Sequence, residues 1–247
     1  MRALLLTLLP LIASPALAQE KFVGTNMDTR TILNFRVSDA ALQKLVPAGW
    51  EVNPATTGPS AGANARVTFV DQIQTGNAER KSVPPVRNLI FGIPVKKTGS
   101  TTSGLMIFAG LSPVAGGPYG ASIEATNAVE RKISHSAAGQ TVKEESWEYK
   151  SNTGYTVTMQ AQYVRNTATR EKSELLVFAQ PKPDFYRIYR YEQGTDVVRG
   201  AGVTDRLQKF SFKATGEKLS PLFDGTEQLI SFNSVPFYAR EIYLPGS

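Results

Sequence analysis

The strongest constraint on how this chain can fold is a strict alternation of side chains from Tyr155 to Tyr163. Hydrophobic residues occupy every second position of this segment, and threonine or glutamine fills every position between them. A period of two is typical of a β-strand with one buried and one solvated face. Further short segments with strand character are separated by Gly, Pro or Asp turns, at 31–37, 65–73, 89–95, 105–111, 173–179, 185–191, 207–214, 227–232 and 237–244. Many short strands with few helices predict a sandwich or a barrel.

Helical signals are sparse. Ser38 or Asp39 can cap a short helix with Leu42 on its apolar face, and Pro47 ends it. A second helix is expected over residues 127–134.

The remaining segments are predicted to be links or loops. They are polar or rich in Gly and Pro, and they include 19–30, 53–64 and 74–86. The chain contains no internal repeat and no linker long enough to divide it. We therefore expect a mostly β fold with minor α content, arranged as one barrel-like domain over residues 19–247.

The N-terminal residues 1–18 have the pattern of a signal peptide. Arg2 supplies a positive start, residues 3–12 are an apolar run, and Ala16 and Ala18 form a small-residue cleavage pattern. The apolar run is too short to span a bilayer, and no later segment is long enough. We therefore expect an exported chain, periplasmic or extracellular, that is cleaved near Ala18 and has no transmembrane segment.

Composition excludes several kinds of site. The sequence has no cysteine, so disulfides, thiolate metal sites and thiol nucleophiles are ruled out. Its one histidine, His135, rules out sites that need several histidine ligands, and we expect no metal and no cofactor. The net charge of +6 suits an anionic ligand. The basic residues are scattered and form no nucleic-acid-binding motif, so no nucleic-acid partner is expected.

Residues Phe35 to Val52 resemble the opening of the acetoacetate decarboxylase-like family. They read as a strand, a short helix of the form D-x-x-x-L-x-x-L-x-P-x-G, and a return strand. The segment 65–70 and the turn 117–120 are compatible with the resemblance. It implies a β-barrel-like fold with a small internal pocket. In decarboxylating members, a lysine in that pocket forms a Schiff base with a small β-keto acid, and a neighbouring lysine lowers its pKa.

The family's Pro-Lys-Lys signature is altered in this chain. Residues 92–97 read GIPVKK, with Ile in place of an aromatic residue and an additional valine before the lysines. The pair also precedes the stretch 117–131, whereas the family places it after the corresponding strand. At the position that the family order predicts, residues 129–135 contain no such pair.

Candidate catalytic residues are Lys96, Lys97, Lys132 and Glu124. Repulsion between adjacent ammonium groups favours loss of one proton, which would make a lysine nucleophilic. On a strand, however, Lys96 and Lys97 point to opposite faces, so at most one of them enters a barrel. Surface placement is the alternative for all three lysines. Glu124 is a candidate general acid or base, or else an outward residue of a strand.

Candidate ligand-binding residues are Arg187, Tyr189 and Tyr191. Alternation places them on one face of a strand, with Arg190 on the other, and an arginine fork can hold a carboxylate. Core packing is the alternative for the tyrosines. His135 lies between two serines, but no nucleophile elbow accompanies it.

Two main functions remain open at this point. The first is an exported acetoacetate decarboxylase-like protein whose pocket binds a small carboxylate or oxo acid. If it is an enzyme, it would be a carboxy-lyase that uses a lysine Schiff base. The alternative is a non-catalytic exported barrel that binds an apolar or amphipathic small molecule; a surface protein acting through partner contacts is a third option. The sequence does not determine the oligomeric state.

Overall fold

The computed structural model describes residues 19–114, 116–120, 124–136 and 141–246. The signal peptide expected at 1–18 lies outside these residues. The described chain is mostly β, as predicted, with one short helix. The elements are β1 (Lys21–Arg36), α1 (Asp39–Gln43), β2 (Trp50–Val52), β3 (Ala65–Gly76), β4 (Ser82–Val83), β5 (Arg87–Lys97), β6 (Ser103–Ser112), β7 (Glu124–Ser136), β8 (Val142–Ser151), β9 (Thr156–Val164), β10 (Thr169–Ala179), β11 (Lys182–Arg199), β12 (Leu207–Thr215) and β13 (Gln228–Leu244).

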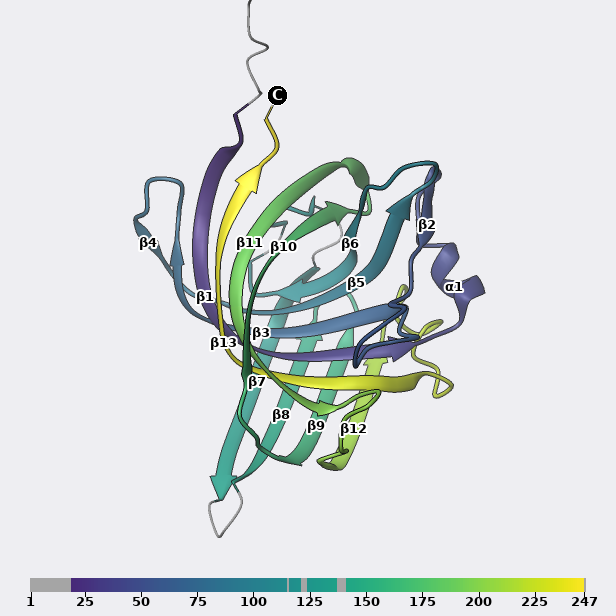
Figure 1. Ribbon diagram of the computed structural model, residues 1–247, viewed down its shortest axis with the longest axis vertical. Coiled ribbons are helices and arrows are strands. Elements are labelled where there is room, and N and C mark those ends of the chain that lie inside the picture. Colours follow the sequence, from purple (N-terminus) through teal and green to yellow (C-terminus); the bar gives the residue numbers. More distant parts are fainter. Residues whose placement is uncertain (1–18, 115, 121–123, 137–140, 247) are drawn as a thin grey trace, which may run out of the picture.

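The strands form one continuous curled sheet. Its order is β12-β9-β8-β7-β6-β10-β11-β13-β1-β3-β5-β2, with β4 beside β3. Because β5 also pairs with β6, the strands from β6 through β10, β11, β13, β1 and β3 to β5 close into a barrel. Figure 1 shows β1, β13 and β11 curving side by side along one wall of this barrel.

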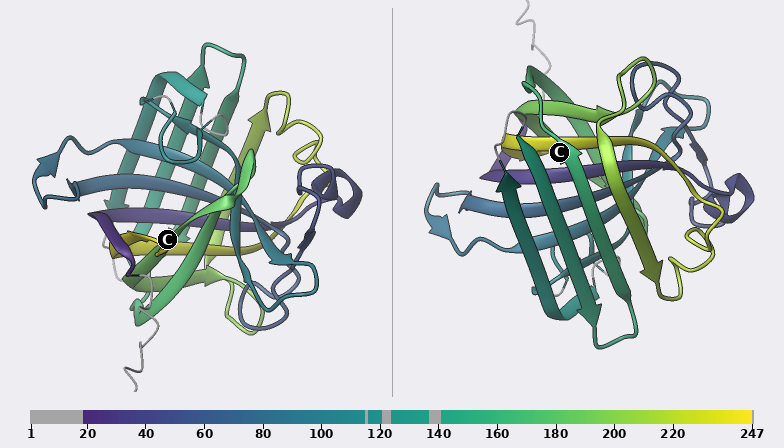
Figure 2. Two further views of the ribbon diagram at one scale, coloured as in Figure 1. Left: turned by 90° about the horizontal axis from the view of Figure 1, so that it is seen from above. Right: turned by 90° about the horizontal axis from the view of Figure 1, so that it is seen from below.

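The strands β7, β8, β9 and β12 form a second layer against the outside of the barrel. Figure 2 shows these strands crossing those of the barrel at a steep angle. The main hydrophobic core fills the space between the two layers and includes Phe35, Phe69, Phe91, Trp147 and Tyr149. The ring centroids of Phe69 and Trp147 lie 5.4 Å apart across this boundary.

Strand alternation gives β1 two different faces. Leu33 and Phe35 point outward into the core between the layers. Asp28 and Arg30, which are bonded to one another, point to the inner face of the barrel. Successive residues of a strand face opposite sides of the sheet, so β1 can carry an apolar and a polar wall at once.

The predicted short helix is confirmed. It spans Asp39–Gln43, and the Ser38 side chain accepts a hydrogen bond from the backbone N–H of Ala41 at 3.3 Å. Leu42 is fully buried and joins the core. Within the described chain, no helix has the length and apolar character needed to cross a membrane.

The helix predicted over residues 127–134 is wrong, because this segment belongs to β7. It pairs with β8 along most of its length. The side chain of Arg131 forms ion pairs in the space between the layers, whereas Lys132 is exposed. Side chains that point alternately inward and outward are typical of a strand. Pairing with β8 supplies the backbone hydrogen bonds that a helix would otherwise make internally.

Two further expectations need correction. The segment 19–30 is not a polar link: most of it belongs to β1, which pairs with β13 and β3. Its polar residues reflect the polar inner face of the barrel. The two strands predicted at 227–232 and 237–244 are one strand, β13. Its ladders with β1 and β11 shift register around the exposed residue Pro236, which lacks a backbone N–H.

Candidate functional site

The inner wall of the barrel contains Arg187, Tyr189 and Tyr191 of β11. Their cross-strand partners on β10 are Val177, Leu175 and Ser173. Val177 and Tyr189 belong to a small hydrophobic cluster inside the barrel, whose partly buried members include Leu175. Residues directly opposite one another share a face of the sheet, so all three candidate ligand-binding residues face inward. Arg190 faces outward and binds Glu20 and Glu174.

A larger polar group surrounds these residues, and we call it the inner cluster. Its members come from β1, β3, β11, β13 and the loop before β7, and all lie on the inner face of the barrel. They are Asn26, Asp28, Arg30, Arg66, Tyr119, Arg187, Tyr189, Tyr191, Tyr238 and Arg240. Segments far apart in the sequence therefore build one site.

Asp28 and Arg30 form the buried ion pair of the inner cluster. Arg30 donates from Nε to Oδ1 at 2.6 Å and from Nη2 to Oδ2 at 2.9 Å. The Arg30 guanidinium lies 3.2 Å from the centre of the Tyr238 ring. Burial disfavours its charge, but the Asp28 carboxylate more than compensates and raises the pKa of Arg30. Arg30 is therefore a neutralised, structural cation.

Three other arginines of the inner cluster have no such partner. Among the described residues, no ion pair includes Arg66, Arg187 or Arg240. Arg66 donates from Nε to Asn34 Oδ1 at 3.1 Å. Arg240 donates from Nε to Asn26, and its guanidinium stacks 4.0 Å from the centre of the Tyr189 ring. Both guanidiniums are thus held at Nε by an uncharged amide oxygen.

The buried Nε of Arg187 has no hydrogen-bond partner among the described residues. Burial lowers the pKa of Arg66, and the Arg30 charge also contributes in that direction. Buried charges in proteins are ordinarily paired, because desolvating a lone charge is costly. The inner wall of the barrel therefore has an excess of positive charge.

The hydroxyls of Tyr119 and Tyr189 are hydrogen-bonded to each other inside the barrel. Tyr119 belongs to the loop between β6 and β7, and its ring packs edge-on against Phe185 at 6.4 Å. Burial, followed by the neighbouring Tyr189, raises the pKa of Tyr119. Its phenol therefore stays protonated at neutral pH and is an uncharged part of the site.

The barrel wall is open along the first half of β10. Residues 169–174 of β10 are exposed on both faces. They pair with β11, while β6 pairs with β10 only at Val177 to Ala179. Glu171 and Ser173 lie at this opening, close to Tyr191. One edge of this half of β10 therefore has no strand partner among the described residues.

The candidate lysines are spread over the molecule. Lys97 is exposed, and its Nζ lies 6.0 Å from the centre of the Trp50 ring on the outer side of β5. Lys96 is half-buried at the end of β5, opposite Glu51 and Ser103. Lys132 is exposed on β7 and forms an ion pair with Glu130 at 3.0 Å. Lys96 and Lys97 are close only because they are neighbours in the sequence, and Lys132 lies on a different strand from both.

Glu124 and His135 lie at opposite ends of β7. Glu124 is half-buried and accepts a hydrogen bond from Thr153 at 3.4 Å. His135 is exposed, and its pKa is lowered by burial and by the charges of Arg165 and Lys143. Within the described chain, no group of three or more acidic or histidine side chains is arranged to hold a metal ion.

Sequence reasoning missed most of the inner cluster. Arg30, Arg66 and Arg240 belong to no recognisable motif in the sequence, and Asp28 lies in the segment 19–30, which is expected to be a polar link. A signal was present, because Asn26, Asp28 and Arg30 are spaced two residues apart, as on one face of a strand. That spacing alone does not say that the polar face would be enclosed.

Comparisons with known proteins bear on the fold. No protein-family model matches the chain, and no curated protein matches its sequence. Among solved structures, it is similar to an acetoacetate decarboxylase-like enzyme from Sphingomonas wittichii RW1, with 10% identity, a TM-score of 0.54 and 96% of each chain covered.

Two further solved structures show the same likeness. The acetoacetate decarboxylase from Legionella pneumophila has 11% identity and a TM-score of 0.52, with 95% of this chain and 91% of that chain covered. The enduracididine biosynthesis enzyme MppR, complexed with pyruvate, has 11% identity and a TM-score of 0.51, with the same coverage. The resemblance predicted from residues 35–52 is thus confirmed at the level of structure: this chain has the fold of the acetoacetate decarboxylase-like enzymes.

Proposed function

We propose that the barrel binds a small carboxylate or oxo acid at the inner cluster. The observation that carries this proposal is that Arg66, Arg187 and Arg240 face the barrel interior without a carboxylate partner. A planar guanidinium presents parallel N–H donors that match the two oxygens of a carboxylate. A bound organic anion would supply the missing negative charge.

The remaining walls suit a small organic acid. The tyrosines offer hydroxyl groups and ring faces, and the adjoining hydrophobic cluster includes Leu105, Ile107 and Ile242. A carboxylate at the arginines would place its carbon chain against these side chains. The structural likeness to MppR, which was solved with pyruvate, supports an oxo acid as the first ligand to test.

Binding is the part of the function that the geometry supports. A Schiff base would need a lysine close to the bound acid, and among the candidates only Lys96 is both half-buried and on the inner-facing side of β5. We therefore assign possible carboxy-lyase chemistry to Lys96 as the candidate to be tested. The signal-peptide pattern of residues 1–18 supports the proposal that binding takes place outside the cytoplasm.

The test is calorimetric titration of the mature protein with pyruvate and acetoacetate. Arg187→Gln removes an inward guanidinium, while the matched control Arg190→Gln removes an outward one from the same strand. We expect Arg187→Gln to weaken binding by about tenfold or more, which corresponds to about 1.4 kcal/mol, and Arg190→Gln to change it by less than about twofold. Equal losses in the two variants, or no binding of either acid by the unmodified protein, would contradict the proposal.

A further inference from the structure

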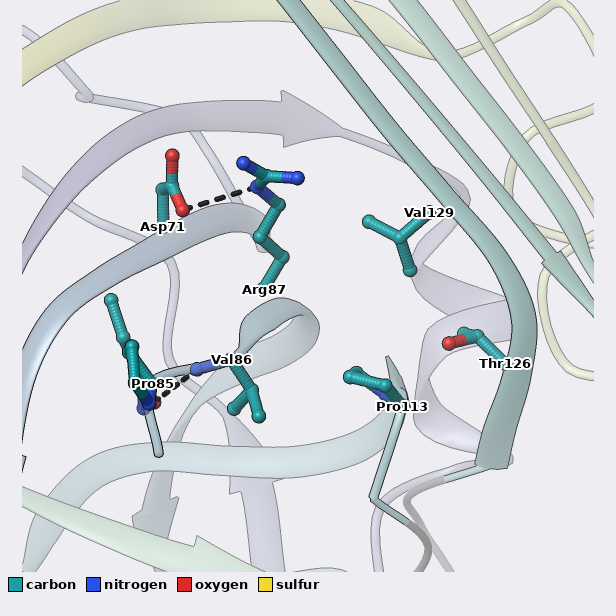
Figure 3. A pocket seen from close by; sticks show the side chains of 8 residues that line it. Asp71, Pro85, Val86, Arg87, Pro113, Thr126 and Val129 are labelled. Atoms are coloured by element: carbon teal, nitrogen blue, oxygen red, sulfur yellow. Dashed lines mark hydrogen bonds and ion pairs between the residues drawn. The ribbon is translucent and has the colours of Figure 1, made fainter. Parts of the chain in front are cut away.

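A second candidate site lies outside the barrel, at its junction with β7. It is a cleft of about 460 Å³. Its lining residues come from β3, from the segment entering β5, from the loop after β6, and from β7: Asp71, Gln72, Pro85, Val86, Arg87, Pro113, Thr126 and Val129. Figure 3 shows Val129 and Thr126 facing Arg87, Val86 and Pro113 across the cleft. Asp71 and Thr29 both bind Arg131 of the outer layer, so this side of the sheet is opposite to the inner cluster.

Unpaired polar atoms are concentrated around this cleft. Five buried side-chain atoms have no hydrogen-bond partner among the described residues, and three of them are Thr126 Oγ1, Arg131 Nε and Tyr149 Oη. Thr126 lines the cleft, and Figure 3 shows its hydroxyl directed toward Pro113. Buried polar groups are satisfied in the great majority of cases, so three exceptions in one place call for an explanation.

Arg131 and Tyr149 belong to the same location. Arg131 binds Asp71, a lining residue, and Tyr149 is the direct cross-strand partner of Val129, another lining residue. Tyr149 is fully buried, and its hydroxyl lies within the electrostatic influence of Asp71, Arg131 and Arg87. Of the three unpaired groups, Thr126 lines the cleft itself, whereas Arg131 and Tyr149 lie behind its lining residues Asp71 and Val129 on the β7–β8 side.

The charges around the cleft are already paired. Arg87 binds Asp71 at 3.2 Å, and Arg131 bridges Asp71 and Glu145. Glu145 also accepts from Lys143 at 2.7 Å. Every one of these cations has a carboxylate partner, in contrast to Arg66, Arg187 and Arg240 of the inner cluster, which have none among the described residues. An additional ionic group would disturb a balanced network, whereas an uncharged hydrogen-bonding group would not.

We propose that this cleft binds a small uncharged organic molecule that has an apolar ring or chain and a hydroxyl or carbonyl oxygen. The oxygen accepts hydrogen bonds from the free donors on the β7–β8 side, namely Arg131 Nε and the hydroxyls of Tyr149 and Thr126. The apolar part packs against Val86, Pro113 and Val129. This site is separate from the inner cluster and does not depend on the proposed function of the barrel.

Trp147 provides the readout. Its ring stacks on Tyr149, with centroids 5.9 Å apart and an interplanar angle of 13°, and Arg131 lies 4.5 Å from its centre. The chain has two tryptophans, so Trp50→Phe leaves Trp147 as the sole emitter. The full chain with this substitution is titrated with cyclohexanone and cyclohexanol as uncharged probes. Cyclohexanecarboxylate is the charged comparison.

We expect a saturable change in emission with the uncharged probes, and none over the same range with the carboxylate. Tyr149→Phe and Thr126→Val each remove one unpaired hydroxyl and keep the side-chain shape, so both variants should fold. Each should weaken the uncharged probe by about fivefold, the size expected for one hydrogen bond. Arg187→Gln, in the barrel, should leave this titration unchanged. A flat titration, affinity in both hydroxyl variants equal to that of the Trp50→Phe parent, or tighter binding of the carboxylate would each overturn the proposal.

Discussion

Asp28 and Arg30 form a two-point ion pair on the inner face of β1, with N–O distances of 2.6 and 2.9 Å. The two residues are two positions apart on β1, so their side chains lie on the same face and one strand supplies both the carboxylate and the cation. Asp28 is fully buried and also accepts a hydrogen bond from Asn26. With its negative charge committed to Arg30, Asp28 leaves the other arginines of the inner cluster available to a ligand.

Removing the carboxylate of this pair should be costly. In Asp28→Asn, the Arg30 guanidinium remains buried with no ionic partner, so we expect a loss of about 3–5 kcal/mol in the free energy of unfolding. Urea denaturation of the two proteins measures this loss. The control is Asp205→Asn, which breaks the exposed pair with Arg199 and should cost less than about 1 kcal/mol. Similar losses in the two variants would argue against a specific role for the buried pair.

Stability should fall at acid pH because of Glu145. Burial raises the pKa of Glu145, but Lys143, Arg131 and the hydrogen bond from Trp147 lower it by more, so the folded-state pKa lies below its ordinary value. A depressed carboxyl pKa stabilises the fold above the unfolded-state value of about 4.3, and this contribution disappears as the pH falls through the folded-state pKa.

Urea denaturation from pH 7 to pH 3 tests this expectation. Glu145→Gln should be less stable than the unmodified protein at pH 7 and should show a flatter loss of stability below about pH 4.3. Glu130 offers a matched control, because it forms an exposed ion pair with Lys132, and Glu130→Gln should change the stability at pH 7 by less than about 1 kcal/mol. If Glu145→Gln lost stability with falling pH as steeply as the unmodified protein, Glu145 would not be the cause of the acid sensitivity.

The hydroxyl pair of Tyr119 and Tyr189 should show energetic coupling. Tyr119→Phe leaves the Tyr189 hydroxyl without this bond inside the barrel, so we expect a loss of about 1–3 kcal/mol. A double-mutant cycle with Tyr189→Phe should give a coupling energy of about 1 kcal/mol, measured by chemical denaturation. Strictly additive losses would mean that the two hydroxyls do not stabilise one another.

Closure of the barrel should depend on Gly104 of β6. A Cβ at this position would overlap the backbone carbonyl oxygen of Leu176 on β10, which cannot move without disturbing the ladder. Gly104→Ala should therefore destabilise the protein by about 1–3 kcal/mol or more. Gly194→Ala, where the nearest atom to an added Cβ is 3.4 Å away, is the control. Thermal unfolding that is unchanged in Gly104→Ala would show that β6 and β10 separate easily.

Borohydride trapping tests lysine chemistry. Lys97 and Lys132 are exposed, and Lys132 is ion-paired with Glu130, so no enclosed site holds an acid against either amine and we expect no specific adduct on them with acetoacetate. A stoichiometric adduct on Lys97 or Lys132 in peptide mass spectra would contradict this expectation. An adduct that is confined to Lys96 and lost in Lys96→Arg would establish an amine catalyst. Its absence would leave a binding barrel.

Much of the fold could be predicted from local patterns. Alternation identified most of the strands, and Ser38 marked the start of the short helix, which ends at Gln43, before the expected stop at Pro47. The same alternation predicted that Arg187, Tyr189 and Tyr191 share a face, and the structure places all three on the inner wall of the barrel. Their role in binding remains a prediction. Errors arose where both faces of a strand are polar, as in the first half of β1, because a strand without an apolar face resembles a link.

The sequence by itself determined a mostly β chain without disulfides and with an excess of basic residues, because strand periodicity and composition are local properties. Only the tertiary structure decided which face of each strand is enclosed and which charges meet. Arg66, Arg187 and Arg240 share the inner face because β11, β13, β1 and β3 are consecutive neighbours in the sheet. The pairing of Thr31 with Glu145, 114 residues apart, likewise depends on how the layers pack. A two-residue period determines which face of the sheet a side chain takes, but not what packs against that face.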